Sequence, residues 1–122
     1  LKEPQHFGFL VPQPLATRWL EEAGHQMAIT NAELLPCLLA RSTWARYLAN
    51  SRLIHFIDNN GCRDCLIKGG SRQSDASCIV AATWLEDGMR GTYSWFTRVP
   101  SASNISDGPS RCDFAEVNAM GC

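Results

Sequence analysis

The segment Arg52–Asn59, with the sequence RLIHFIDN, decides the fold class of this chain. Its near-continuous apolar run predicts a strand over 52–58 that is buried on both faces, as strands are in the middle of an α/β sheet. Alternation of side chains places Ile54, Phe56 and Asp58 on one face of that strand. The strand stops on Asp58, and burying a carboxylate without a partner is very costly. We therefore expect Asp58 to lie at a site that supplies a partner for its charge.

The segments on either side of this strand alternate between helical and extended patterns. Helices are expected over 15–26, over 32–49, from beyond Asp58 to 68, and over 74–88; strands are expected over 6–11 and 92–99, and a brief extended stretch over 27–30. Gly24 is expected to close the first helix, Asn31 to cap the second, and Ser74 or Asp75 to cap the last. Pro36 fits the second helix only in or near its first turn. Since no repeat or linker interrupts the pattern, the prediction is a single α/β domain over 1–122.

The composition limits the classes of function. The chain has 122 residues, 45% of them hydrophobic and 19% charged, which is typical of one globular domain. Its formal net charge of −1 gives no global reason to bind nucleic acid, so binding would need a local patch or metal ions that reverse the sign of an acidic site. No apolar run reaches the length of a membrane span, and residues 1–14 lack the layout of a signal peptide. We expect an intracellular protein, with no membrane partner, that is a fragment of a longer chain.

Six cysteines leave two chemical alternatives open. Cys62 and Cys65 are three residues apart on a predicted helix, and with Cys78 and His55 they suggest a zinc site, although no second close pair supplies four well-spaced ligands. The same pair resembles a redox CxxC motif, which normally starts a helix after a strand. Cys37 lies in a Leu-rich helical segment, where a free thiol packs as a small apolar group. Six cysteines could also indicate a secreted disulfide scaffold, but reduced, intracellular thiols are the favoured interpretation, because the chain is long enough to form a core without disulfides.

Three acidic residues stand in separate local contexts. Glu33 is in a Leu- and Ala-rich helical segment, Asp58 ends the strand, and Asp107 lies in the turn-rich segment 100–111. Converging carboxylates would form a site for divalent metal ions. Each acid also has a simpler explanation. Glu33 could be a first-turn acid favoured by the helix dipole, Asp58 a helix N-cap, and Asp107 part of an ordinary turn.

In this order and these contexts the acids resemble the ribonuclease H-like domain that follows reverse transcriptase in retroelement polyproteins. The resemblance runs from about Phe7 to Arg111. Asp58–Asn59 is similar to the DN or DS pair that ends the family's strand. Asn104–Asp107, followed by Ser110–Arg111, resembles the family's N-x-x-D…SR signature and is the most specific part of the match.

The resemblance implies a mixed central sheet flanked by helices. It implies that Glu33, Asp58 and Asp107 hold Mg²⁺ or Mn²⁺ for two-metal hydrolysis of RNA in RNA–DNA hybrids. The implied contacts to nucleic acid are Asn59, Arg98, Asn104 and Arg111. The implied partners are an RNA–DNA hybrid or other nucleic acid and an adjoining reverse transcriptase domain.

One departure from the family pattern bears on activity. The family's first acid lies on an earlier strand, in a phrase such as TDAS or SDAS, and no such phrase precedes Glu33. SDAS occurs only at Ser74–Ser77, after Asp58, where it is typical of a helix cap. We expect the first strand or strands to be missing and hydrolysis by this chain to be weak or absent. A non-catalytic structural or nucleic-acid-binding module of the same fold, and a small thiol-bearing α/β protein, are the alternatives.

Overall fold

The structure is a computed structural model that describes Gln5, residues 7–100, Ser103 and Asn104. The chain divides into two compact units, of which Val11–Arg98 is one, while Leu1–Leu10 and Val99–Cys122 form the other. In the second of these, the rings of Phe7 and Phe9 stack with centroids 6.4 Å apart. Residues 7–11 are irregular, so the strand predicted over 6–11 is wrong for the described part of that segment.

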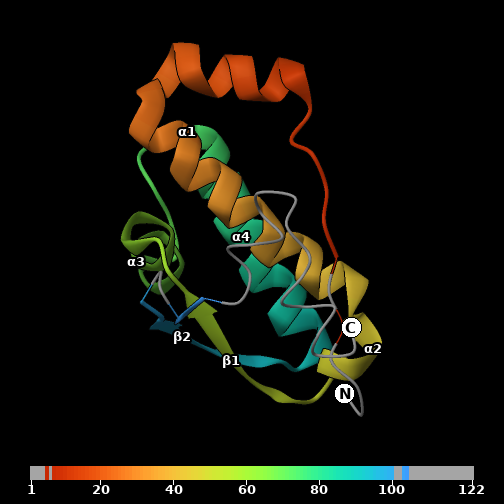
Figure 1. The fold of residues 1–122 in the computed structure, drawn as a ribbon. Helices are drawn as coiled ribbons and strands as arrows, with labels where there is room; N and C mark the ends of the chain where they lie inside the picture. The colour runs from red at the N-terminus through yellow and green to blue at the C-terminus, as the bar shows by residue number, and fades with distance from the viewer. Residues whose placement is uncertain (1–4, 6, 101–102, 105–122) are drawn as a thin grey trace. The chain divides into compact units, whose positions relative to one another are not determined.

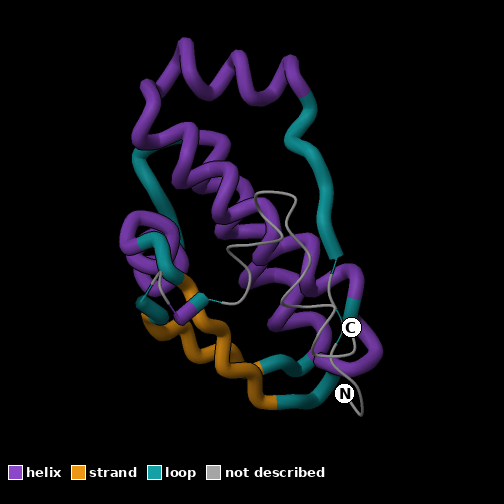
Figure 2. Tube along the Cα trace, viewed as in Figure 1, coloured by secondary structure: helices purple, strands orange, loops and turns teal. Residues whose placement is uncertain are grey.

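Helix α1, Gln13–Thr43, is bent at Gly24 (Figures 1 and 2). Gly24 has φ 81° and ψ 175°, a backbone conformation that is essentially restricted to glycine. The predicted end of a helix at this glycine is therefore present as a sharp kink. Pro14 falls in the first turn, where its missing N–H costs no hydrogen bond.

The part of α1 after the kink differs from the prediction. Residues 27–30 are helical rather than extended, and Asn31 lies inside the helix rather than at its N-cap. The Asn31 side chain is buried and donates from Nδ2 to Oε1 of Gln73 at 3.1 Å. Pro36 is in the helix interior, not in a first turn. Tertiary packing overrides the cost of this proline because Leu34, Cys37 and Arg41 form a buried stripe at helical spacing.

The sheet contains two parallel strands in the described part of the chain. Strand β1, Arg52–Ile57, follows the short helix α2, Ala45–Leu48, and pairs with β2, Tyr93–Arg98. The register places Arg52 opposite Tyr93 and Ile57 opposite Arg98. The connection between the strands runs through α3, Asn60–Lys68, and α4, Ser74–Arg90. This β-α-α-β arrangement is a parallel α/β crossover, which confirms the α/β class.

Both crossover helices are capped by side chains. Oδ1 of Asn59 accepts from the amide of Cys62 at 2.8 Å, and Oε1 of Gln73 accepts from the amide of Ala76 at 2.7 Å. The N-cap of α4 is thus Gln73, one residue before the predicted Ser74 or Asp75. The helix also continues past the predicted end to Arg90, where Gly91 takes the left-handed conformation of a C-cap with φ 69°.

The core lies between the helices and one face of the sheet. In Figure 1, α4 runs alongside the C-terminal part of α1, and together they cover that face. The buried apolar cluster consists of Leu34, Cys37, Ile57, Cys62, Leu66, Ala76, Val80 and Phe96. The opposite face is exposed, so the prediction of a strand buried on both faces is wrong. No helix in the described part of the chain is long and apolar enough to cross a membrane.

Candidate functional site at the carboxyl end of the sheet

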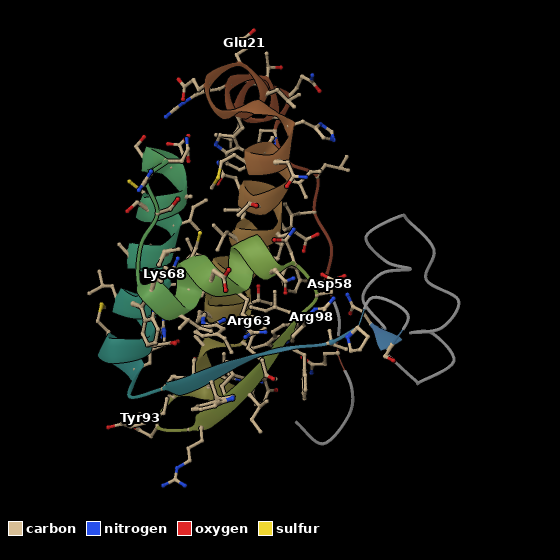
Figure 3. The ribbon with its side chains drawn as sticks, turned by 90° about the vertical axis from the view of Figure 1, so that its left-hand side faces the viewer. Glu21, Asp58, Arg63, Lys68, Tyr93 and Arg98 are labelled. Atoms are coloured by element: carbon tan, nitrogen blue, oxygen red, sulfur yellow. The ribbon has the colours of Figure 1, made fainter. Side chains whose placement is uncertain are left out.

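Asp58 follows the last residue of β1 and is half-buried. Arg98 is the last residue of β2, opposite Ile57 in the register, so Asp58 and Arg98 lie at the same end of the sheet. Figure 3 shows these two labelled residues together, with Tyr93 at the other end of β2. The carboxyl ends of parallel strands are the usual place for ligands in α/β proteins. Asp58 therefore lies at that end of the sheet, and its role as a ligand stays a prediction.

Asn59, and not Asp58, caps the helix that follows. The side chain of Asn59 accepts the amide hydrogen of Cys62, which is the interaction that defines an N-cap. The simpler explanation of Asp58 as a helix cap is therefore wrong.

Glu33 lies on α1, near the N-terminus of α3. The two helices are in close contact there, because a methyl group added at Gly61 would lie 2.9 Å from Oγ1 of Thr30. The Glu33 charge is among the causes that raise the pKa of the Cys62 thiol, after the hydrogen bond with Cys37, burial and the charge of Cys37. Glu33 on α1 and Asp58 at the end of β1 thus both lie near the N-terminus of α3. Glu33 is not in a first turn, since the Gly24 kink lies nine residues before it.

The other predicted site residues are Asn104, Asp107 and Arg111. Asp107 and Arg111 lie outside the described residues, and Asn104 belongs to the other compact unit. Within residues 5, 7–100, 103 and 104, no three His, Cys, Asp or Glu side chains gather as metal ligands. This also bears on the zinc alternative, because Cys62 is buried while Cys78 is exposed. The described carboxylates could hold a cation only together with other ligands.

A buried polar network that the sequence analysis missed joins α1, α4 and both strands. Nε of Arg41 donates to Oδ1 of Asp87 at 3.1 Å, and both side chains are almost fully buried. Nη2 of Arg41 donates to Oγ of Ser94 at 2.9 Å, and that hydroxyl donates to Oδ2 of Asp87 at 2.6 Å. Every link has one donor and one acceptor, so the charges are paired inside the core. The sequence signal for this network is Arg41, which follows Leu34 and Cys37 at the spacing of one helix face.

The network fixes the tautomer of His55. Nη1 of Arg41 lies 2.9 Å from Nδ1 of His55, and since arginine only donates, Nδ1 must accept. The proton of a neutral His55 is then on Nε2, which lies 3.8 Å from the Cys37 sulfur. The pKa of the Cys37 thiol is lowered well below its ordinary value by hydrogen bonds from Cys62 and His55 and by the charge of Arg41, which outweigh burial. Cys37 is 4% exposed, so this thiol is part of the core and has no access for a substrate.

Comparison with known proteins found no matching protein-family model, no matching curated protein and no matching solved structure.

Proposed function

We propose that this chain is a ribonuclease H-like domain of the kind that follows reverse transcriptase in retroelement polyproteins. The observation that carries the proposal is the position of Asp58 at the carboxyl end of β1, with Glu33 near the same helix N-terminus. The order of elements, a helix bearing an acid, a strand ending in an acid, and a parallel strand reached through two helices, supports it.

In this proposal Glu33, Asp58 and Asp107 hold Mg²⁺ or Mn²⁺, which prefer carboxylate oxygens and retain some of their waters. Bound divalent metals would activate water and neutralise the leaving oxygen of a phosphodiester. The three carboxylates would position the metal ions, and other side chains would position the nucleic acid. Arg98, at the same end of the sheet as Asp58, is suited to a phosphate. Asn59 is occupied at its side-chain oxygen by Cys62, so any contact with nucleic acid would use its amide nitrogen.

The resemblance implies a fourth acid on an earlier strand, which this sequence does not offer before Glu33. Because positioned metals carry most of the catalysis at such sites, we expect the purified chain to bind divalent metal but to cleave RNA–DNA hybrid weakly or not at all. Robust Mg²⁺-dependent cleavage that Asp58→Asn abolishes would contradict that expectation and favour a complete active site.

Thermal melts with and without Mn²⁺ test the metal site. A ligand that binds only the folded state stabilises it by about 1.4 kcal/mol at ten times its dissociation constant, so wild type should melt at a higher temperature in millimolar Mn²⁺. Asp58→Asn should lose most of this shift. Asp64→Asn is the matched control, because Asp64 is an exposed acid on α3. Equal shifts for wild type and Asp58→Asn would show that Asp58 is not a metal ligand and would leave the non-catalytic module as the better reading.

A further inference from the structure

Two buried thiols from different elements meet in the core. Cys37 on α1 is 4% exposed and Cys62 on α3 is 0% exposed, and both belong to the buried apolar cluster. Their side chains are hydrogen-bonded to one another. The helices come this close because Gly61, which precedes Cys62, has no side chain where Oγ1 of Thr30 lies. Thr30 is two turns before Cys37 on the same side of α1. The fold therefore brings together two thiols that are far apart in the sequence.

The surroundings of the pair make one of its thiols a nucleophile. Nε2 of His55 lies 3.8 Å from the Cys37 sulfur, and Arg41 donates to the other ring nitrogen at 2.9 Å. These contacts, together with the hydrogen bond from Cys62, lower the pKa of the Cys37 thiol. The hydrogen bond with Cys37 and burial raise the pKa of the Cys62 thiol. Since the thiolate is the reactive form of cysteine, Cys37 is the attacking sulfur and Cys62 supplies a protonated thiol beside it.

The other described thiols are less suited to pair with Cys62. Cys65 is three residues further along α3, and Cβ atoms at that helical spacing are about 5–6 Å apart. A disulfide needs Cβ atoms about 3.5–4.5 Å apart, so a bridge between Cys62 and Cys65 would distort the helix. Cys78 is exposed on α4, outside the buried cluster. Among the described cysteines, Cys37 is thus the partner that the fold gives to Cys62.

We propose that Cys37 and Cys62 are a site of reversible oxidation, at which hydrogen peroxide converts the two thiols into a disulfide that links α1 to α3. The Cys37 sulfur attacks one oxygen of the peroxide and the O–O bond breaks, which gives a sulfenic acid and water. The Cys62 sulfur then attacks the Cys37 sulfur and the S–O bond breaks, so the proton of Cys62 leaves with the hydroxyl group as a second water. Two thiols together lose one electron pair, and one peroxide is reduced to two waters.

Because both sulfurs are buried, peroxide reaches them during local opening of the core, and their oxidation should be slower than that of the exposed Cys78. The site is independent of the proposed metal site, since no step uses the carboxylate of Glu33 or Asp58.

Peptide mapping without reductant, after oxidation of the folded chain by hydrogen peroxide in EDTA and alkylation of the remaining thiols, tests this. We expect a crosslinked Cys37–Cys62 peptide that dithiothreitol reverses, and a melting temperature raised by about 5–10 °C. Cys62→Ala should abolish the crosslink and leave Cys37 as a sulfenic acid that dimedone labels. Cys78→Ala is the matched control and should retain the crosslink. Oxidation of the chain unfolded in urea should instead favour Cys62–Cys65, because closing a short loop costs less entropy.

Absence of the Cys37–Cys62 peptide from the folded wild-type chain, at a peroxide dose that oxidises Cys78, would overturn the proposal, and this result needs no variant to fold. The same distribution of crosslinks in the folded and the urea-unfolded chain would show that the fold does not select the pair. A Cys62–Cys65 bridge in the folded chain would assign the chemistry to the CxxC motif instead. Because the assay contains EDTA, its failure is distinct from loss of the Mn²⁺ response of Asp58.

Discussion

Arg41 and Asp87 form a buried ion pair in the interior of Val11–Arg98. Their side chains are 1% and 2% exposed, and the carboxylate also accepts from Ser94. A buried charge that loses its partner is destabilising by about 3–5 kcal/mol, whereas a well-packed apolar replacement of both partners can be neutral. The network therefore makes the two residues interdependent.

Asp87→Ala should accordingly lower the free energy of unfolding by about 3–5 kcal/mol in denaturant titrations. The double variant Arg41→Met with Asp87→Leu should recover much of that loss, since it leaves no unpaired buried charge. Glu86→Ala, which breaks the partly exposed Glu86–Arg90 pair, is the control and should cost about 0.5 kcal/mol or less. A small effect of Asp87→Ala would contradict the buried network.

The thiol of Cys37 should make stability depend on pH. Its pKa is lowered in the folded state, so between that lowered value and the ordinary thiol pKa of about 8.5 the unfolded chain binds more protons. The stabilisation is therefore present above the ordinary pKa and lost as pH falls through the lowered one. Cys37→Ala should be more destabilising at pH 8.5 than at pH 6.5 in urea titrations. Cys78→Ala, at an exposed thiol, should show no such difference; a Cys37→Ala effect independent of pH would count against the lowered pKa.

The sequence pattern of 52–59 predicts Asp58 at a strand end but does not distinguish a metal ligand from a helix cap. The distinction depends on whether residue 58 or 59 reaches the amide of Cys62, a one-residue shift that local pattern does not encode. The burial of Asp87 was not predictable from the sequence, because a carboxylate near the end of an amphipathic helix ordinarily faces water.

Among the elements, α1 contains the largest difference between prediction and structure. The local propensities of residues 27–30 and Asn31 predict an interruption of the helix there. In the structure the helix is interrupted at Gly24 and continues through residues 27–31. The buried stripe of Leu34, Cys37 and Arg41 continues the helix beyond it, and such packing is set by partners far along the chain. Both strands of the described sheet were predictable because their β-branched and aromatic content is strong.

Gly24→Ala should destabilise the fold by about 1–3 kcal/mol, because its φ of 81° and ψ of 175° suit glycine alone. Gly88→Ala is a matched control within α4, where an added methyl group meets nothing within 4 Å. That substitution should stabilise by about 0.5–1 kcal/mol, through helix propensity. Denaturant titrations of both variants measure the contrast. Equal effects in the two variants would show that the kink is not required.

For the molecule as a whole, the two parallel strands establish which end of the sheet is available to a ligand. The order of acids along the chain predicted that Glu33, Asp58 and Asp107 form one site. Of the three, Glu33 and Asp58 lie on elements that meet near the N-terminus of α3. The exposed outer face was not predictable, because an apolar run in a strand does not distinguish burial by helices on one side from burial on both.

Paramagnetic broadening of amide resonances by Mn²⁺ tests the metal site proposed at Glu33 and Asp58. At substoichiometric Mn²⁺ we expect the amides around Asp58 and Glu33 to broaden first, while the amide of Tyr93, at the opposite end of β2, stays sharp (Figure 3). Asp58→Asn should remove the selective broadening, and Asp64→Asn should retain it. Broadening centred on Glu21 and Glu22, or broadening that is the same in wild type and Asp58→Asn, would contradict a metal site at the carboxyl end of the sheet.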